Sequence, residues 1–325
     1  MKNCLVTFTA AAALVPLLAL SQTRASGPWW PNPEWGADDQ AGASNRITPA
    51  KVMEAAALVT TGRIYELGHP YSQDMPLRGG RVYSLVSAGK GPARASNGFV
   101  SNEEMVASQI GQVGTQFDGL GHIGQEILMA DGRAESVFYN GITSGEMDGR
   151  NGLAKLGIEH VKPIVTRGVL IDVAAHQGVD TLASGYEVTL ADVRGALARQ
   201  GMTEADLREG DAILFRYGWS RLWGDPAAFN ESAPGIGLEV ARWLVQRRPS
   251  MVAADSWPVE VVPARDPDQF RPVHQELITR NGIFILENLK LEELAAEDTH
   301  EFMFIMTPIA FTGASGSPAR PLAIR

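Results

Sequence analysis

One glycine-rich segment, residues 111–124 (GQVGTQFDGLGHIG), carries four side chains that can bind a metal ion: Gln112, Gln116, Asp118 and His122. A helix would point Asp118 away from the two glutamines, and the glycines disfavour a helix. An extended strand would place Gln112, Gln116 and Asp118 on one face, because side chains two and four apart project the same way. The segment therefore predicts a strand with a polar face, followed by a turn that returns His122 towards that face.

A single Gln, Asp or His beside a glycine-rich turn commonly forms only local hydrogen bonds. Four together are harder to explain in this way, since polar side chains aligned on one strand face are costly to bury unless something binds them. Carboxylate and amide oxygens with an imidazole suit a hard or borderline divalent cation. We therefore expect a metal site in this segment.

The spacing of these residues, Q-x3-Q-x-D-x3-H, resembles the signature of the metal-dependent cyclase-like hydrolase superfamily. Its kynurenine formamidases and isatin hydrolases carry H-x-G-T-H-x-D-x3-H at the same spacing. Gln112 and Gln116 stand where those relatives have His. In this respect the chain resembles the zinc-dependent trans-dienelactone hydrolase branch, which has Gln at both positions. The resemblance extends from about Trp35 to the C-terminus. It implies the swivelling β/β/α architecture and a homodimer or homotetramer.

A second stretch, residues 272–288, predicts a helix followed by a buried strand that ends in Glu287. Pro272 suits the first turn of the helix, and Gly282 suits its end. His274 would lie in that first turn, where the helix dipole disfavours protonation and holds the imidazole neutral. The residues H-x2-L-I-x4-I-x-I-L-E-N-L also resemble the superfamily's helix and strand, in which a His and an acidic residue belong to the site.

The two stretches together predict one metal centre. The expected ligands, with the family pattern as a guide, are Gln116, Asp118 and Glu287, completed or oriented by Gln112 and His122. His274 is the expected proton shuttle. Two carboxylates balance one divalent ion, so we expect one Zn²⁺ per chain, with Mn²⁺ as the alternative. Such a cation polarises a carbonyl and lowers the pKa of its bound water towards about 7.

The chemistry that fits this centre is hydrolysis of a carbonyl bonded to oxygen or nitrogen. A small lactone is the expected substrate, with a cyclic amide or an N-formyl amide as alternatives. A non-catalytic, exported ligand-binding protein is the rival interpretation. Trp219 and Trp257 are candidates for walls of the substrate pocket. The sequence lacks a phosphate-binding loop, a nucleotide fingerprint and a serine elbow, the parts required for phosphoryl transfer, nicotinamide chemistry and serine hydrolysis.

The remaining pattern predicts one α/β or α+β domain of alternating strands and helices. The formal net charge of −9 disfavours nucleic acid and anionic membranes as partners. A loop between two of the predicted strands holds His69, Asp74 and Arg78, and loops of this kind often line sites. The predicted helices span 49–60, 189–200, 237–248 and 272–282, and the predicted strands 63–67, 81–86, 168–174, 211–217, 251–254, 283–287 and 301–309.

The N-terminus has the features of a secretory signal peptide: Lys2, an apolar run over residues 5–20, and small residues after it. We expect a signal over residues 1–25 and a mature domain over 26–325 that opens with an irregular arm, 26–48. The mature protein would be periplasmic or secreted, and an uncleaved N-terminal anchor is the alternative. Cys4 is the single cysteine and lies in the signal, so disulfides and thiol chemistry are excluded after cleavage.

Overall fold

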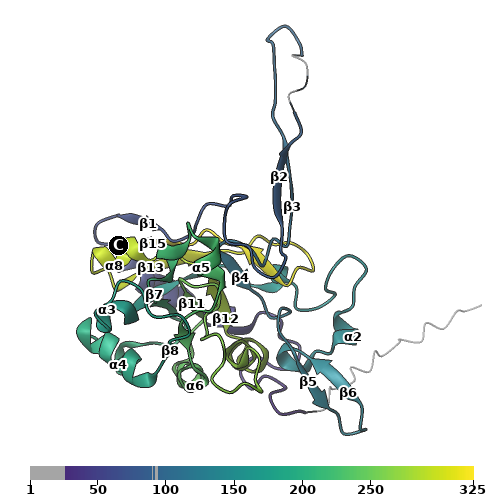
Figure 1. The fold of residues 1–325 in the computed structure, drawn as a ribbon. Coiled ribbons are helices and arrows are strands. Elements are labelled where there is room, and N and C mark those ends of the chain that lie inside the picture. Colours follow the sequence, from purple (N-terminus) through teal and green to yellow (C-terminus); the bar gives the residue numbers. More distant parts are fainter. Residues whose placement is uncertain (1–25, 90, 92–93) are drawn as a thin grey trace, which may run out of the picture.

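A nine-stranded mixed sheet forms the centre of the molecule, with the strand order β1-β15-β13-β7-β9-β11-β12-β4-β14 (Figure 1). The computed structural model describes residues 26–89, 91 and 94–325. The predicted signal peptide lies outside these residues. Within them, no helix is both long enough and apolar enough to span a membrane.

Four neighbouring strands at the centre of the sheet run parallel to one another and are almost entirely buried. They are β7 (Ile164–Asp172), β9 (Ala212–Arg216), β11 (Met251–Ala254) and β12 (Phe284–Glu287). Their apolar runs reflect burial on both faces, which is typical of parallel strands covered by helices. These four strands confirm the strands predicted from the same runs.

Antiparallel strands extend the sheet at both edges. Beyond β7 lie β13 (Glu301–Met306), β15 (Leu322–Ile324) and β1 (Ile64–Glu66). Beyond β12 lie β4 (Gln116–Asp118) and β14 (Gly316–Pro318). The sheet therefore places β4, from the glycine-rich segment, directly beside β12, from the second chemical stretch.

Helices cover the sheet, and their ends follow local signals in the sequence. Thr189 caps the helix predicted over 189–200 through a reciprocal capping box with Asp192. The longer helices are α1 (Pro49–Ala56), α4 (Leu190–Arg199) and α6 (Leu238–Arg247). Shorter helices are α2 (Ser144–Met147), α3 (Val173–His176), α5 (Pro226–Asn230), α7 (Pro272–His274) and α8 (Glu292–Ala296).

The predicted helix over 272–282 contains two kinds of turn. After α7 the chain widens into a π-helical segment, η6 (Gln275–Arg280), and ends at Gly282 with a φ of 63°. Such π-turns are frequent at functional sites. His274 is the last residue of α7 and directly precedes this π-helical segment.

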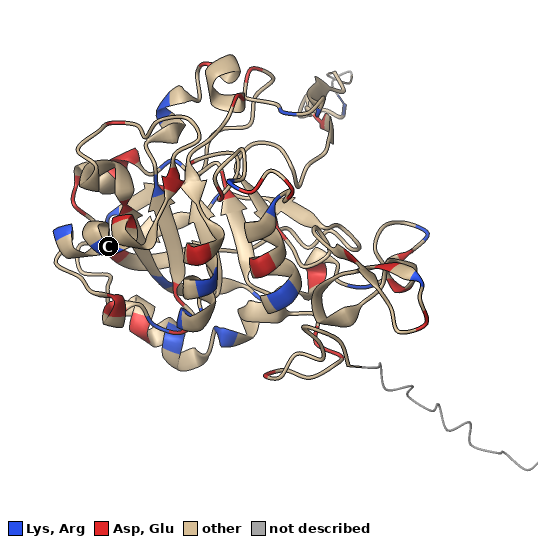
Figure 2. Ribbon diagram, turned by 60° about the horizontal axis from the view of Figure 1, so that its bottom comes forward, with Lys and Arg blue, Asp and Glu red and all other residues tan. Residues whose placement is uncertain are grey.

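Among the residues that the structure describes, three short strand pairs lie outside the main sheet. The longest is a hairpin of β2 (Tyr83–Ser87) and β3 (Glu104–Ser108), which projects far from the body (Figure 1). The others are β5 (Gln125–Leu128) with β6 (Ala134–Val137), and β8 (Glu187–Val188) with β10 (Gly235–Ile236). Charged residues are spread over the outer helices and loops, while the strands of the central sheet are mostly uncharged (Figure 2).

The N-terminal arm is irregular, as predicted, and packs on the body. Asn32 donates from its Nδ2 atom to the Tyr139 hydroxyl at 2.9 Å, and that hydroxyl donates to Asp39 at 2.8 Å. Trp30 is buried as well.

The predicted strand over the glycine-rich segment is wrong for its first half. Only Gln116–Asp118 forms a strand. Gly114 adopts a φ of 63°, and the backbone N–H of Gln112 donates to the Gln109 carbonyl at 2.7 Å, which closes a turn. The left-handed conformation at Gly114 breaks the extended chain. Gln116 and Asp118 still share one face of β4, whereas Gln112 reaches the site from a turn.

Candidate metal centre and substrate cavity

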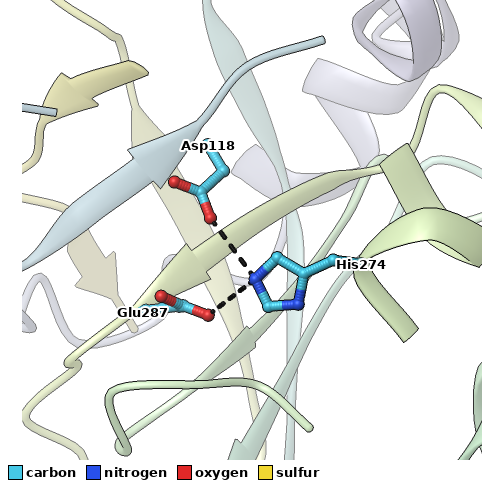
Figure 3. A group of neighbouring side chains, drawn as sticks. All are labelled: Asp118, His274 and Glu287. Atoms are coloured by element: carbon cyan, nitrogen blue, oxygen red, sulfur yellow. Dashed lines mark ion pairs between the residues drawn. The ribbon is translucent and has the colours of Figure 1, made fainter. Parts of the chain in front are cut away.

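Three ionisable side chains converge where β4 and β12 meet α7: Asp118, His274 and Glu287 (Figure 3). Antiparallel pairing sets Glu287 opposite Gln116, on the polar face that Asp118 shares. All three side chains are buried, with exposed fractions of 1% for Asp118, 5% for His274 and 3% for Glu287. One potential ligand atom from each lies within 4.8 Å of the others.

The arrangement of these atoms fits a divalent cation. His274 Nε2 lies 3.2 Å from Glu287 Oε1 and 3.7 Å from Asp118 Oδ2. Asp118 Oδ2 is buried and accepts no hydrogen bond within the described part of the chain. A buried carboxylate oxygen without a donor is costly, and a cation would supply the missing partner. Two carboxylates and an imidazole are ligands that zinc and manganese accept.

The two glutamines orient the carboxylates through their amide nitrogens. Gln116 Nε2 donates to Glu287 Oε2 at 2.9 Å, and Gln112 Nε2 donates to Asp118 Oδ1 at 2.7 Å. The Gln112 oxygen accepts from Arg81 Nη2 at 3.2 Å. Gln112 therefore orients Asp118, which is one of the two roles expected for it. Gln116, which was expected to be a ligand, lies directly against Glu287.

His274 contacts Glu260, a carboxylate that was not among the predicted site residues. Glu260 Oε1 is in close contact with His274 Nδ1, and Oε2 accepts from the Val273 amide at 3.0 Å. Burial lowers the pKa of His274, but the charges and hydrogen bonds of Glu260 and Glu287 raise it to about 10. The helix dipole that was expected to disfavour protonation does not dominate here, because α7 is a single turn and the Val273 and His274 amides donate to Glu260.

Glu260 also changes the charge balance that was expected. Asp118 and Glu287 were the only carboxylates counted, whereas the structure places a third beside His274. A cation bound at His274 Nε2 would require that nitrogen to be unprotonated, so the three carboxylates would carry −3 and one divalent ion would leave −1. One local signal could have pointed to Glu260: it ends the Trp-Pro-Val-Glu stretch that follows β11.

His122 lies at the edge of the group. Its Nε2 atom is 3.9 Å from Asp118 Oδ1, and 20% of its side chain is exposed. The predicted turn is confirmed, since the His122 amide donates to the Gly119 carbonyl at 3.1 Å. His122 is therefore close to the centre and still open to the cavity in front of it.

A cavity of about 540 Å³ opens onto the centre. Its lining includes Gln112, Gln116, His122, His274 and Glu287 from the centre, with Arg78, Gly79, Arg81, Ile123, Trp257, Pro258, Phe270 and Arg271 around them. Trp257, a candidate for a wall of the substrate pocket, is among these residues. Arg78, from the predicted loop, lies with its Cζ atom 3.4 Å from the centroid of the Trp257 ring.

Trp219 does not take part in this wall, and its prediction was wrong. Its side chain is 3% exposed and its Nε1 atom donates to the Phe229 carbonyl at 3.1 Å. Gly218, with a φ of 74°, turns the chain after β9, and the Trp219 amide donates to Asp255 at 3.1 Å. These contacts direct the indole into the core.

Comparisons with known proteins agree with this architecture. Residues 65–261 match the family described as "Putative cyclase". A solved structure described as a novel cyclase is 31% identical, covers 90% of this chain and 98% of its own, and superposes with a TM-score of 0.79. A comparison with curated proteins found no match.

Two isatin hydrolases share the fold at lower identity. Isatin hydrolase A from Ralstonia solanacearum is 20% identical over 86% of this chain and 98% of its own, with a TM-score of 0.60. Isatin hydrolase A from Labrenzia aggregata, bound to benzyl benzoate, is 20% identical over 80% of this chain and 93% of its own, with a TM-score of 0.56. These matches confirm the predicted mixed α/β, cyclase-like fold.

Proposed function

Because this chain belongs to the cyclase family, we propose that it is a metal-dependent hydrolase that opens a small lactone. Cyclic amides and N-formyl amides are the alternative substrates, since their hydrolysis requires the same apparatus. The observation that carries the proposal is the buried group of Asp118, His274 and Glu287, in which Asp118 Oδ2 has no hydrogen-bond donor.

In this proposal Asp118, His274 and Glu287 hold one Zn²⁺, with Mn²⁺ as the alternative. A bound cation of this kind polarises a carbonyl and lowers the pKa of water, so that hydroxide is available near neutral pH. Gln112 and Gln116 keep the two carboxylates oriented through the hydrogen bonds described above.

The contacts of His274 and His122 favour roles that differ from those expected from the sequence. Both ring nitrogens of His274 face carboxylates, Nδ1 towards Glu260 and Nε2 towards Glu287 and Asp118. Neither is left to exchange a proton with a substrate, so His274 acts as a ligand that Glu260 positions. His122, partly exposed beside Asp118, transfers the proton to the leaving oxygen or nitrogen.

A panel of small lactones, cyclic imides and N-formyl aromatic amines tests the proposal. We expect turnover of at least one class, its loss on treatment with a chelator, and its return on addition of Zn²⁺. An Asp118→Ala variant should lose metal and turnover together. Turnover that survives both the chelator and this substitution would defeat the proposal. Metal binding without turnover of any class would favour the non-catalytic interpretation.

A further inference from the structure

The imidazole of His122 forms no hydrogen bond of its own within the described residues. The carboxylate beside it belongs to Asp118, whose Oδ1 atom lies 3.9 Å from His122 Nε2, beyond hydrogen-bond distance. A side chain that delivers a proton must nevertheless lie within hydrogen-bond reach of the reacting atom. The position of the His122 ring therefore depends on the backbone that carries it.

The chain before His122 is fixed by close backbone contacts. The Gly119 amide donates to the Ser315 carbonyl at 2.9 Å, and the His122 amide donates to the Gly119 carbonyl at 3.1 Å. A Cβ atom at Gly121 would lie only 3.0 Å from the Leu156 carbonyl oxygen, so the turn has little space for a side chain there. The turn that leads into His122 is thus tightly packed.

The chain after His122 is held by two side chains of the π-helical segment η6. Thr279 Oγ1 donates to the Ile123 carbonyl at 2.9 Å, and Gln275 Nε2 donates to the Gly124 carbonyl at 3.3 Å. Ile123 and Gly124 lie between His122 and β5 and belong to no helix or strand. Thr279 is fully buried, where an unmade hydrogen bond is costly. The two bonds therefore anchor the two residues that directly follow His122.

The segment η6 also begins at the other histidine of the centre. His274 directly precedes η6, and its Nε2 atom faces Asp118 and Glu287. Gln275 and Thr279 are four residues apart, about one helical turn, and both reach the loop of His122. One short element thus follows the proposed metal ligand and holds the loop of the proposed proton-transferring residue. The distance between the two histidines is therefore set by η6.

We propose that Thr279 and Gln275 are positioning residues, which fix His122 at the distance from the metal centre that proton transfer requires. This assignment rests on the proposed function, in which His122 transfers the proton and His274 binds the metal. Neither Thr279 nor Gln275 is among the residues that line the cavity, so both act only through the backbone after His122. A misplacement of about 1 Å at a reacting group can lower a rate about 10²-fold, so these distant hydrogen bonds affect turnover.

Thr279→Val removes the hydroxyl and keeps the shape of the side chain. We expect kcat to fall roughly tenfold, KM to change by less than about twofold, and the metal content to stay at the wild-type level. Thr279→Ser, which retains the hydroxyl, should restore most of kcat. Gln275→Met removes the amide from a side chain that is only partly buried, so it tests the same loop with less risk to folding. Wild-type kcat in both Thr279→Val and Gln275→Met would overturn the inference.

Thr166→Val is the matched control for the loss of a buried hydroxyl. Thr166 is fully buried and donates its hydroxyl to the Gly210 carbonyl at 2.7 Å. It lies on β7, which three strands of the sheet separate from β4. We expect this variant to lose stability towards urea much as Thr279→Val does and to keep the wild-type kcat. An equal loss of kcat in the two Val variants would show a general structural effect and overturn the inference.

A comparison of leaving groups distinguishes a displaced proton donor from a general loss of structure. A lactone of a phenol releases an oxygen that requires little protonation, whereas a lactone of an aliphatic alcohol releases one that requires a proton. The loss of kcat in Thr279→Val and Gln275→Met should therefore be several times larger for the aliphatic lactone, by roughly three- to tenfold. An equal loss for the two lactones would overturn the inference and leave the proposed function in place.

Histidine NMR tests the placement of His122 without any turnover. The chain contains six histidines, and labelling of their Cε1 carbons gives each a signal, that of His122 being identified by its absence in His122→Ala. The His122 signal should shift or broaden in Thr279→Val and Gln275→Met and stay unchanged in Thr166→Val. A His122 signal that is the same in all three variants would overturn the inference. A shifted signal without turnover of any substrate would uphold the placement of His122 and overturn the proposed function.

Discussion

At the scale of single residues, the two histidines of the centre give the sharpest test of the roles proposed for them. His274→Ala removes a side chain whose Nε2 atom faces both carboxylates, so the purified variant should contain far less metal than wild type. His122→Ala should keep one metal per chain and lose about 10²- to 10⁴-fold in turnover, the usual contribution of a proton-transferring residue. Elemental analysis and initial rates measure the two effects.

The reverse result would restore the assignment made from the sequence. A His274→Ala variant with wild-type metal content and strongly reduced turnover would identify His274 as the shuttle. Two tightly bound ions per wild-type chain would contradict the single cation. Gln112→Asn is a milder change than either histidine substitution. It shortens the side chain that orients Asp118 and leaves both histidines in place.

Asp255 predicts how stability depends on pH. Burial and the charge of Glu292 raise the pKa of Asp255 to about 8, even though it accepts hydrogen bonds from the Tyr217 and Trp219 amides and lies near Arg216. Between pH 6.5 and 8 the folded protein therefore binds more protons than the unfolded chain, and its free energy of unfolding should fall by roughly 1–2 kcal/mol as pH rises. Urea unfolding at several pH values measures this slope.

The slope should be smaller in Asp255→Asn, which has no titrating carboxyl at this position. The comparison must be made between the two proteins at each pH, because the other titrating groups contribute the same slope to both. Parallel curves for wild type and variant over pH 6.5–8 would show that Asp255 does not titrate there.

Asp211, which directly precedes β9, lies at the centre of a buried ionic cluster. Lys51 Nζ lies 2.5 Å from its Oδ1 atom and Arg167 Nη2 lies 3.3 Å from its Oδ2 atom, with all three side chains buried. Asp211→Ala would leave two buried cations without this partner, so it should cost about 3–5 kcal/mol in unfolding free energy. Glu66→Ala breaks an exposed pair with Arg320 and should cost about 1 kcal/mol or less. Similar costs for the two variants would contradict this account.

At the scale of elements, the hairpin of β2 and β3 exposes an apolar surface that an isolated hairpin cannot stabilise. Val86 and Met105 lie directly opposite each other, and their exposed fractions are 49% and 65%. Two-stranded hairpins alone in water are marginally stable, and large exposed apolar patches mark interaction surfaces. We expect a second copy of the chain to cover this surface, in keeping with the homodimer or homotetramer that the family resemblance implies.

Light scattering after size-exclusion chromatography tests this expectation. A Val86→Glu and Met105→Glu double variant should have a lower molar mass than wild type. Leu128→Glu is the control, because Leu128 is 76% exposed on the separate hairpin of β5 and β6. A double variant with the wild-type molar mass would contradict the assignment of this surface.

Elements whose signals are local were predictable from the sequence. The apolar run of β11 gave its bounds without error, and the capping box of α4 marked its start, because both depend on neighbouring residues. The pairing of β4 with β12 was not predictable, since it joins segments some 170 residues apart. The same limit applies to the site: Asp118 and Glu287 belong to recognisable patterns, whereas Glu260 reaches His274 only through the tertiary fold.

At the scale of the whole molecule, the expected export of the protein concerns residues outside the described chain. The described structure begins with the arm that packs on Tyr139, so cleavage before it would leave the body intact. N-terminal sequencing of the protein from the periplasm or medium should find a start between about Gln22 and Ser26. A chain that still begins at Met1 would remove this prediction and favour the anchored alternative.

The arginine-lined cavity has a consequence for the timing of the reaction cycle. Hydrolysis of a lactone ring creates a carboxylate and a hydroxyl group, so the product carries one more negative charge than the substrate. The guanidinium groups of Arg78, Arg81 and Arg271, which line the cavity, would then retain the product more strongly than the substrate. Departure of product, and not cleavage of the ring, would set the pace of successive turnovers. Added salt, by weakening that retention, would then accelerate the enzyme at saturating substrate.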